Sequence, residues 1–179
     1  MRQAKLGITI NKLSEKLVSL TRITLESRLD LTVEDGKRCQ YNIQTSNKFF
    51  NHMLTGVASR ACLNFDISYR STQAEILDHV IVEDTGLTLG RAIRELIDVR
   101  IIKGVNGRGT YTVAFDEALV TVTLAFDGRA YTFWQNELAT RPPSTSQTLQ
   151  NRFGFPLGAA LRKYFVTMLE DVGIMRPHG

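Results

Sequence analysis

The chain predicts an α+β fold in which helices pack on a mostly antiparallel sheet, and two patterns support this. Several short stretches alternate apolar and polar residues, which is typical of strands with one face toward solvent. Between them, residues 45–61 and 78–98 place apolar residues at helical spacing. The order of two strands, a helix, a strand, a helix, three strands and a last helix is typical of an α+β domain.

The first segments predict an extension followed by a hairpin. Residues 1–20 are expected to be an N-terminal extension, with leucines at rough helical spacing. Residues 21–33 alternate apolar and polar side chains, which predicts one strand with one solvent-exposed face. Asp35 and Gly36 form a hairpin turn signal, so residues 39–43 are expected to return as the next strand.

Two helices and a strand come next. Residues 45–47 are Thr, Ser and Asn, which offer N-caps for a helix that bears His52. Residues 65–69 alternate again as a strand. A second helix is expected from Asp78, as its cap, to Asp98. After a glycine-rich connection at 104–109, the remaining predictions are strands at 111–115, 120–126 and 129–134, a loop at 138–151 and a helix at 157–169.

Composition narrows the classes of function. The formal charge of +4 comes from scattered basic residues, which suits an anionic small molecule and argues against nucleic acid. Cys39 and Cys62 lack metal-ligand spacing, so reduced thiols are the simpler interpretation. The sequence has no apolar run of membrane-spanning length and no signal-peptide core. We therefore expect a cytoplasmic protein with no membrane partner.

His79 and Glu83 are the first candidate pair for chemistry. They stand four residues apart in the second predicted helix and so share one face. An imidazole and a carboxylate in that arrangement can bind one divalent cation. The alternative is an ordinary helix start with acidic residues in its first turns. His52, taken alone, is more typical of a helix-edge histidine than of a ligand.

Five stretches, kept in order across residues 21–134, resemble the imidazoleglycerol-phosphate dehydratase family. The family patterns are R-x-T-x-E, F-F-D-H-M-L with Asn in place of Asp, D-H-H-x-x-E-D-T followed by L-G, M-D-E-A-L, and the S-G-R turn. In this sequence they correspond to residues 22–26, 49–54, 78–90, 115–119 and 128–129.

The resemblance implies a fold and an organisation. It implies a ribosomal-protein-S5-domain-2-like βα sandwich with two similar halves. The extension of residues 1–20 would precede a first half-domain at 21–103, which bears the H-x-x-x-E motif, and a shortened second half-domain at 104–179. It further implies a homo-oligomer.

The resemblance also implies an activity and a set of site residues. The activity is a metal-dependent dehydration of imidazoleglycerol phosphate, or of a related small phosphorylated molecule, in histidine biosynthesis. The implied roles are manganese ligation by His52, His79 and Glu83, proton transfer by Glu26 and Glu117, and substrate binding by Arg129 and Arg108. The alternative roles are a solvated strand residue for Glu26 and a turn arginine for Arg129.

The sequence departs from the family pattern at several positions. The second histidine of D-H-H-x-x-E-D-T is Val80, a further family histidine falls at Arg60, and an arginine falls at Gly107, beside Arg108. The second H-H-x-x-E motif has no counterpart, and besides His52 and His79 the chain has one more histidine, His178. This inventory allows one manganese site or none, so two alternatives stay open. They are a non-catalytic structural or ligand-binding oligomer, and a regulatory subunit that assembles with an active homologue.

Overall fold

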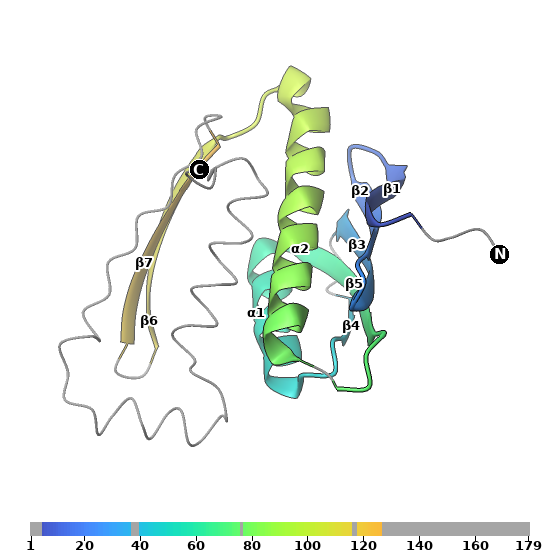
Figure 1. The fold of residues 1–179 in the computed structure, drawn as a ribbon. Helices are drawn as coiled ribbons and strands as arrows, with labels where there is room; N and C mark the ends of the chain where they lie inside the picture. Colours follow the sequence, from blue (N-terminus) through green and yellow to red (C-terminus); the bar gives the residue numbers. More distant parts are fainter. Residues whose placement is uncertain (1–4, 37–39, 76, 116–117, 127–179) are drawn as a thin grey trace, which may run out of the picture.

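A computed structural model describes residues 5–36, 40–75, 77–115 and 118–126. Two helices cover one face of a five-stranded sheet, and a two-stranded sheet follows them in the chain (Figure 1). The strand order of the larger sheet is β1-β2-β3-β5-β4. The predicted α+β class, with helices on a mostly antiparallel sheet, is confirmed.

The sheet begins with three antiparallel strands, β1 (Gly7–Leu13), β2 (Leu17–Ile23) and β3 (Ser27–Asp35). The single strand predicted over residues 21–33 is therefore wrong, because the chain reverses between Thr24 and Ser27. The backbone N–H of Thr24 donates to the Ser27 carbonyl at 2.9 Å and closes this turn. The helical spacing in residues 1–20 was also misleading, since β1 and the start of β2 occupy that segment.

The other edge of the sheet contains a parallel pair. β4 (Tyr41–Gln44) pairs in parallel with β5 (Leu63–Ser71), and β5 also pairs antiparallel with β3. The prediction that residues 39–43 return against the preceding strand is wrong, because β5 occupies the position beside β3. Parallel neighbours need a crossover connection, which α1 (Lys48–Ala61) provides.

The start of α1 follows the sequence prediction. Asn47 is its N-cap, and the Asn47 side-chain oxygen accepts a hydrogen bond from the Phe50 backbone N–H at 2.9 Å. The helix ends at Ala61, and its C-cap, Cys62, adopts a left-handed conformation with φ 55°.

The second helix, α2 (Asp78–Arg100), starts differently from the prediction and continues into a short 3-10 turn, η1 (Ile101–Lys103). Its N-cap is Leu77, which makes no side-chain capping bond, so the predicted cap at Asp78 is wrong. Asp78 is the first helical residue, where its negative charge still favours the helix N-terminus. The Asp78 carboxylate accepts a hydrogen bond from the Asn47 amide at 3.0 Å, which joins the starts of the two helices.

A hairpin of β6 (Arg108–Phe115) and β7 (Ala118–Ala125) follows, as predicted. In Figure 1 it lies on the side of the helices away from the larger sheet. The elements predicted at 129–134, 138–151 and 157–169 lie outside the described residues. The division into two half-domains stays a prediction.

The hydrophobic core lies between the larger sheet and the two helices. Alternate residues of β2, β3 and β5 face the helices and are buried, as are apolar residues of both helices. The buried core residues are Val18, Leu20, Leu29, Leu31, Val33, Phe50, Leu54, Ala58, Phe65, Ile67, Tyr69, Ile81, Val82, Leu89, Ala92 and Leu96. Among the helices that the structure describes, none is both long and apolar enough to span a membrane.

Candidate functional site

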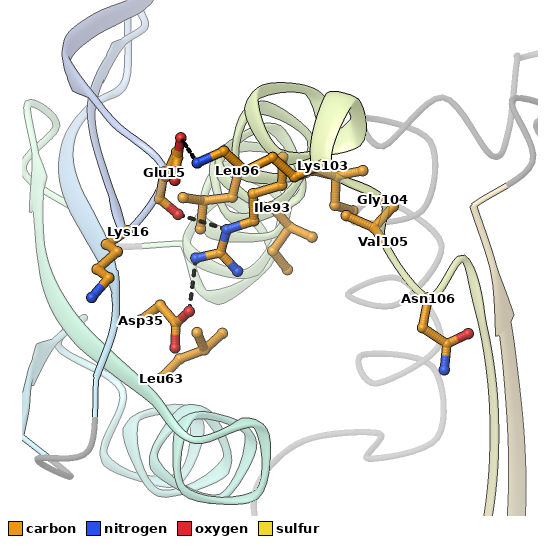
Figure 2. A pocket seen from close by; sticks show the side chains of 12 residues that line it. Glu15, Lys16, Asp35, Leu63, Ile93, Leu96, Lys103, Gly104, Val105 and Asn106 are labelled. Atoms are coloured by element: carbon orange, nitrogen blue, oxygen red, sulfur yellow. Dashed lines mark hydrogen bonds and ion pairs between the residues drawn. The ribbon is translucent and has the colours of Figure 1, made fainter.

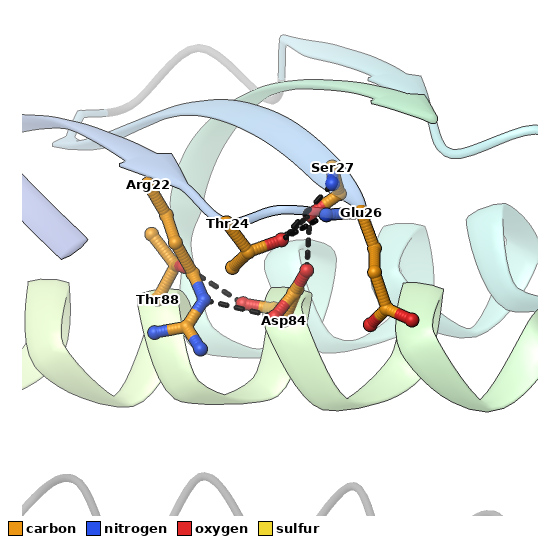
Figure 3. A network of polar contacts seen from close by, with 6 residues as sticks. All are labelled: Arg22, Thr24, Glu26, Ser27, Asp84 and Thr88. Atoms are coloured by element: carbon orange, nitrogen blue, oxygen red, sulfur yellow. Dashed lines mark hydrogen bonds and ion pairs between the residues drawn. The ribbon is translucent and has the colours of Figure 1, made fainter. Parts of the chain in front are cut away.

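A buried carboxylate lies where the sheet meets the first half of α2. Asp84 is 4% exposed, and its Oδ1 accepts a hydrogen bond from Arg22 Nε at 2.9 Å (Figure 3). Its Oδ2 accepts a hydrogen bond from the Ser27 hydroxyl. The backbone carbonyl of Asp84 also accepts from the Thr88 hydroxyl at 2.7 Å. Asp84 therefore links α2 to the end of β2 and to the start of β3.

The turn between β2 and β3 bears Glu26. The Thr24 hydroxyl accepts hydrogen bonds from the backbone N–H groups of Glu26 at 3.1 Å and Ser27 at 2.9 Å. It also lies 3.0 Å from the Ser27 hydroxyl. Glu26 is exposed, and its side chain extends from the turn toward α2 (Figure 3).

Tyr69 of β5 belongs to the same group of polar side chains. Burial raises the pKa of the Tyr69 phenol, and the charges of Asp84 and Glu26 raise it further. The phenol therefore lies within the electrostatic influence of two carboxylates and stays protonated at neutral pH.

The predicted metal-binding pair lies on α2, directly before Asp84. His79 and Glu83 stand one turn apart, His79 exposed and Glu83 half-buried. Val80, at the position of the family's second histidine, is buried with 8% exposure. The motif therefore has one exposed imidazole where the family pattern has two histidines.

His52 lies on the neighbouring helix α1 and is exposed. Across the described part of the chain, no three His, Cys, Asp or Glu residues form a group that could hold a metal ion. The structure therefore does not bring His52, His79 and Glu83 together as a three-ligand centre within one chain. Manganese prefers about six ligands, so the described donors of one chain do not complete a manganese site.

Asn51, which stands where the family pattern has Asp, acts as a hydrogen-bond acceptor. Its side-chain oxygen accepts hydrogen bonds from the Thr45 backbone N–H at 3.0 Å and the Thr45 hydroxyl at 2.6 Å. Both bonds go to an oxygen that asparagine and aspartate have in common. An aspartate at this position could therefore accept the same two bonds.

The remaining predicted residues belong to the second half of the chain. Arg108 is exposed at the first position of β6. Glu117 and Arg129 lie outside the described residues. Their roles in proton transfer and substrate binding stay predictions.

Sequence reasoning missed the central position of Asp84 and its partners. A signal was present, because Arg22 belongs to the first motif and Asp84 to the third, and their side chains have opposite charges. Periodicity did not reveal the pair, since polar residues at these positions suit an exposed strand face and a helix start equally well.

A cavity of about 580 Å³ lies at the other end of α2 (Figure 2). Charged side chains at its rim pair with one another: Arg100 lies 2.8 Å from Asp35, and Lys103 lies 2.6 Å from Glu15. None of the predicted site residues lines this cavity. We therefore place the candidate site at the N-terminal half of α2.

The fold is that of a known class of enzymes. A solved structure of imidazoleglycerol-phosphate dehydratase from Staphylococcus aureus superposes with a TM-score of 0.58, at 21% identity, covering 88% of this chain and 79% of that one. This likeness shows a common βα-sandwich fold, as the resemblance implied.

Residues 45–153 match the sequence model of the family described as imidazoleglycerol-phosphate dehydratase. A relative of that name from Granulibacter bethesdensis is 31% identical over 156 residues, covering 84% of this chain and 76% of the relative. Another, from Microcystis aeruginosa, is 34% identical over 131 residues, covering 73% and 61%. The chain belongs to the imidazoleglycerol-phosphate dehydratase family. It spans about three-fifths of the length of several of its curated relatives, with 61% and 62% coverage.

Proposed function

We propose that the protein is a carbon–oxygen lyase that dehydrates imidazoleglycerol phosphate or a related phosphorylated small molecule. The observation that supports this most strongly is the arrangement on α2. His79 and Glu83 lie one turn apart, directly before the buried Asp84 that links α2 to the turn bearing Glu26. Family membership supports the same chemistry.

In this proposal His79 and Glu83 bind a divalent cation, manganese in the first instance. A bound cation would orient the substrate and polarise one of its oxygens. The described donors of one chain do not complete the site, so the remaining ligands come from a second copy of the chain, with His52 as the candidate. The proposal therefore includes a homo-oligomer.

Glu26 is the proposed proton-transfer group, since its carboxylate is exposed and thus open to a substrate. Glu117 is the second candidate for proton transfer. Arg108 and Arg129 are proposed to bind the substrate phosphate, which guanidinium groups suit through paired hydrogen bonds. The net charge of +4 also favours the binding of an anionic substrate.

The test is to count the manganese bound per chain and to assay loss of imidazoleglycerol phosphate. We expect metal binding by the wild-type protein and a loss of at least about tenfold in affinity in His79→Ala, which removes a ligand, and in Glu83→Gln, which replaces a charged oxygen donor with a neutral one. Asp98→Asn, which alters an exposed carboxylate near the other end of α2, is the matched control and should bind as the wild type does. A wild-type stoichiometry near zero overturns the proposal.

The burial of Val80 and the absence of a three-ligand group in the described residues favour a second candidate. This candidate is a non-catalytic family member that acts as a structural or ligand-binding oligomer. It predicts no bound metal and no effect of His79→Ala on folding or assembly. A regulatory subunit would, in addition, form mixed particles when expressed with an active homologue.

A further inference from the structure

The two oxygens of the Asp84 carboxylate reach both sides of one turn. Oδ1 accepts from Arg22 at the end of β2, and Oδ2 accepts from Ser27 at the start of β3. The turn between these strands contains Glu26, the proposed proton-transfer group. Because Asp84 is buried on α2, this carboxylate joins the turn to the helix that bears His79 and Glu83.

The directions of the hydrogen bonds follow from the chemistry of the groups. An ionised carboxylate only accepts, so Ser27 Oγ uses its one proton for Asp84. The Thr24 hydroxyl, 3.0 Å away, must then donate to Ser27 Oγ. Its lone pairs are left to accept from the backbone N–H groups of Glu26 and Ser27. A directed chain of hydrogen bonds thus runs from the helix to the backbone of Glu26.

We infer that Asp84 and Thr24 are positioning residues that hold Glu26 at a fixed place over α2, an inference that rests on the proposed function. The position of the exposed Glu26 side chain depends on the position of its backbone. The Glu26 backbone N–H donates to the Thr24 hydroxyl, which holds this backbone in place. When the hydroxyl is removed, the Glu26 carboxylate samples a wider range of positions while the buried core stays intact. A misplacement of about 1 Å at a reacting group can reduce a rate about 100-fold.

The test compares Thr24→Val, which deletes the hydroxyl and keeps the side-chain shape, with Thr24→Ser, which keeps the hydroxyl. With saturating manganese and imidazoleglycerol phosphate, we expect kcat of Thr24→Val to fall about 10- to 100-fold with KM little changed. Thr24→Ser should restore kcat to within about threefold of wild type. Asp84→Asn, which keeps the shape of the side chain, should lower kcat in the same direction.

Thr21→Val is the matched control. Thr21 lies on β2, the strand that leads into the turn, and its hydroxyl also donates to a carboxylate, that of Asp30 at 2.7 Å, but on the sheet face away from α2. This variant should keep the wild-type kcat. A Thr24→Val kcat within about twofold of wild type, or a Thr24→Ser variant as slow as Thr24→Val, overturns the inference.

A second measurement keeps the inference separate from the proposed function. Amide hydrogen exchange at Glu26 and Ser27, followed by NMR, reports the bonds to the Thr24 hydroxyl directly. Protection of these amides should fall in Thr24→Val and persist in Thr24→Ser. If the wild type turns over no substrate, the proposed function fails, and this exchange comparison still decides whether the network holds the turn. Unchanged protection in Thr24→Val overturns the inference whatever the turnover.

Discussion

The buried ion pair between Arg22 and Asp84 gives a sharp prediction about stability. Arg22→Met replaces the aliphatic part of the arginine with a side chain of similar length but removes the positive charge. The Asp84 carboxylate, whose side chain is 6% exposed, then lacks its cation. At an effective dielectric constant of about 20, unit charges about 4 Å apart attract by about 4 kcal/mol. Removal of one partner of a buried pair costs about 3 to 5 kcal/mol. Because a fifth of the Arg22 side chain reaches solvent and Ser27 still donates to Asp84, we expect a loss of about 3 kcal/mol.

The assay is urea unfolding followed by circular dichroism, with the change in unfolding free energy taken at constant m-value. The Arg28–Asp30 pair, on the same hairpin but with side chains 50% and 38% exposed, provides the control, and Arg28→Met should cost about 1 kcal/mol or less. The double variant Arg22→Met with Asp84→Asn should recover part of the loss, because no buried charge then remains unpaired. An Arg22→Met cost no larger than that of Arg28→Met, or a double variant whose cost is the sum of the single costs, refutes the reasoning.

Three further predictions concern the same part of the chain. Asn47→Ala removes the N-cap of α1 and should lower the unfolding free energy by about 1 kcal/mol in the same urea assay. The hydrogen bond from Arg28 lowers the pKa of Asp30, with help from the Thr21 hydroxyl and against the effect of burial. The ionised Asp30 therefore stabilises the fold above its unfolded pKa, and this contribution is lost as pH falls through the lowered folded pKa. In urea unfolding at a series of acid pH values, the unfolding free energy of Asp30→Asn should fall less than that of the wild type. The raised pKa of Tyr69 has the opposite consequence. The contribution of its protonated phenol to the unfolding free energy is complete below an unfolded pKa of about 10 and is lost as pH rises. Thermal melts of Tyr69→Phe should show a smaller alkaline loss than wild type, and equal losses would contradict this assignment.

The helices were predictable because their signals are local. The cap at Asn47, the apolar spacing along α1 and α2, and the hairpin break before β7 all appear in the structure close to the expected residues. Each depends on neighbouring residues in the chain, which a periodic pattern records directly.

The errors in the predicted strands arose where the alternation of apolar and polar residues does not specify a turn or the strand that pairs with a given strand. The turn from Thr24 to Ser27 contains no Gly, Pro or Asn, and a threonine hydroxyl replaces their turn-forming role. Apolar residues at Ile23, Leu25 and Leu29 kept the alternating spacing on both sides of the turn, interrupted only at Ser27, and so concealed the turn. Similarly, the pattern of β4 marked it as a strand, but its pairing with β5 depends on the crossover through α1, which alternation alone does not encode.

The candidate site was predictable in part for the same reason. His79 and Glu83 share a helix face because of their spacing, which the sequence records. The contact between Arg22 and Asp84 joins residues 62 positions apart, and only the folded sheet and helix bring them together.

The burial of Val80 bears on whether this chain could accommodate a second histidine beside His79. A histidine at that position would place a polar ring in a space that is 8% exposed and now filled by a β-branched aliphatic side chain. A polar group in such a space destabilises the fold unless it finds a hydrogen-bond partner. Val80→His would thus make the protein less stable before it supplied a new ligand. Packing at position 80 therefore opposes the introduction of a second histidine beside His79.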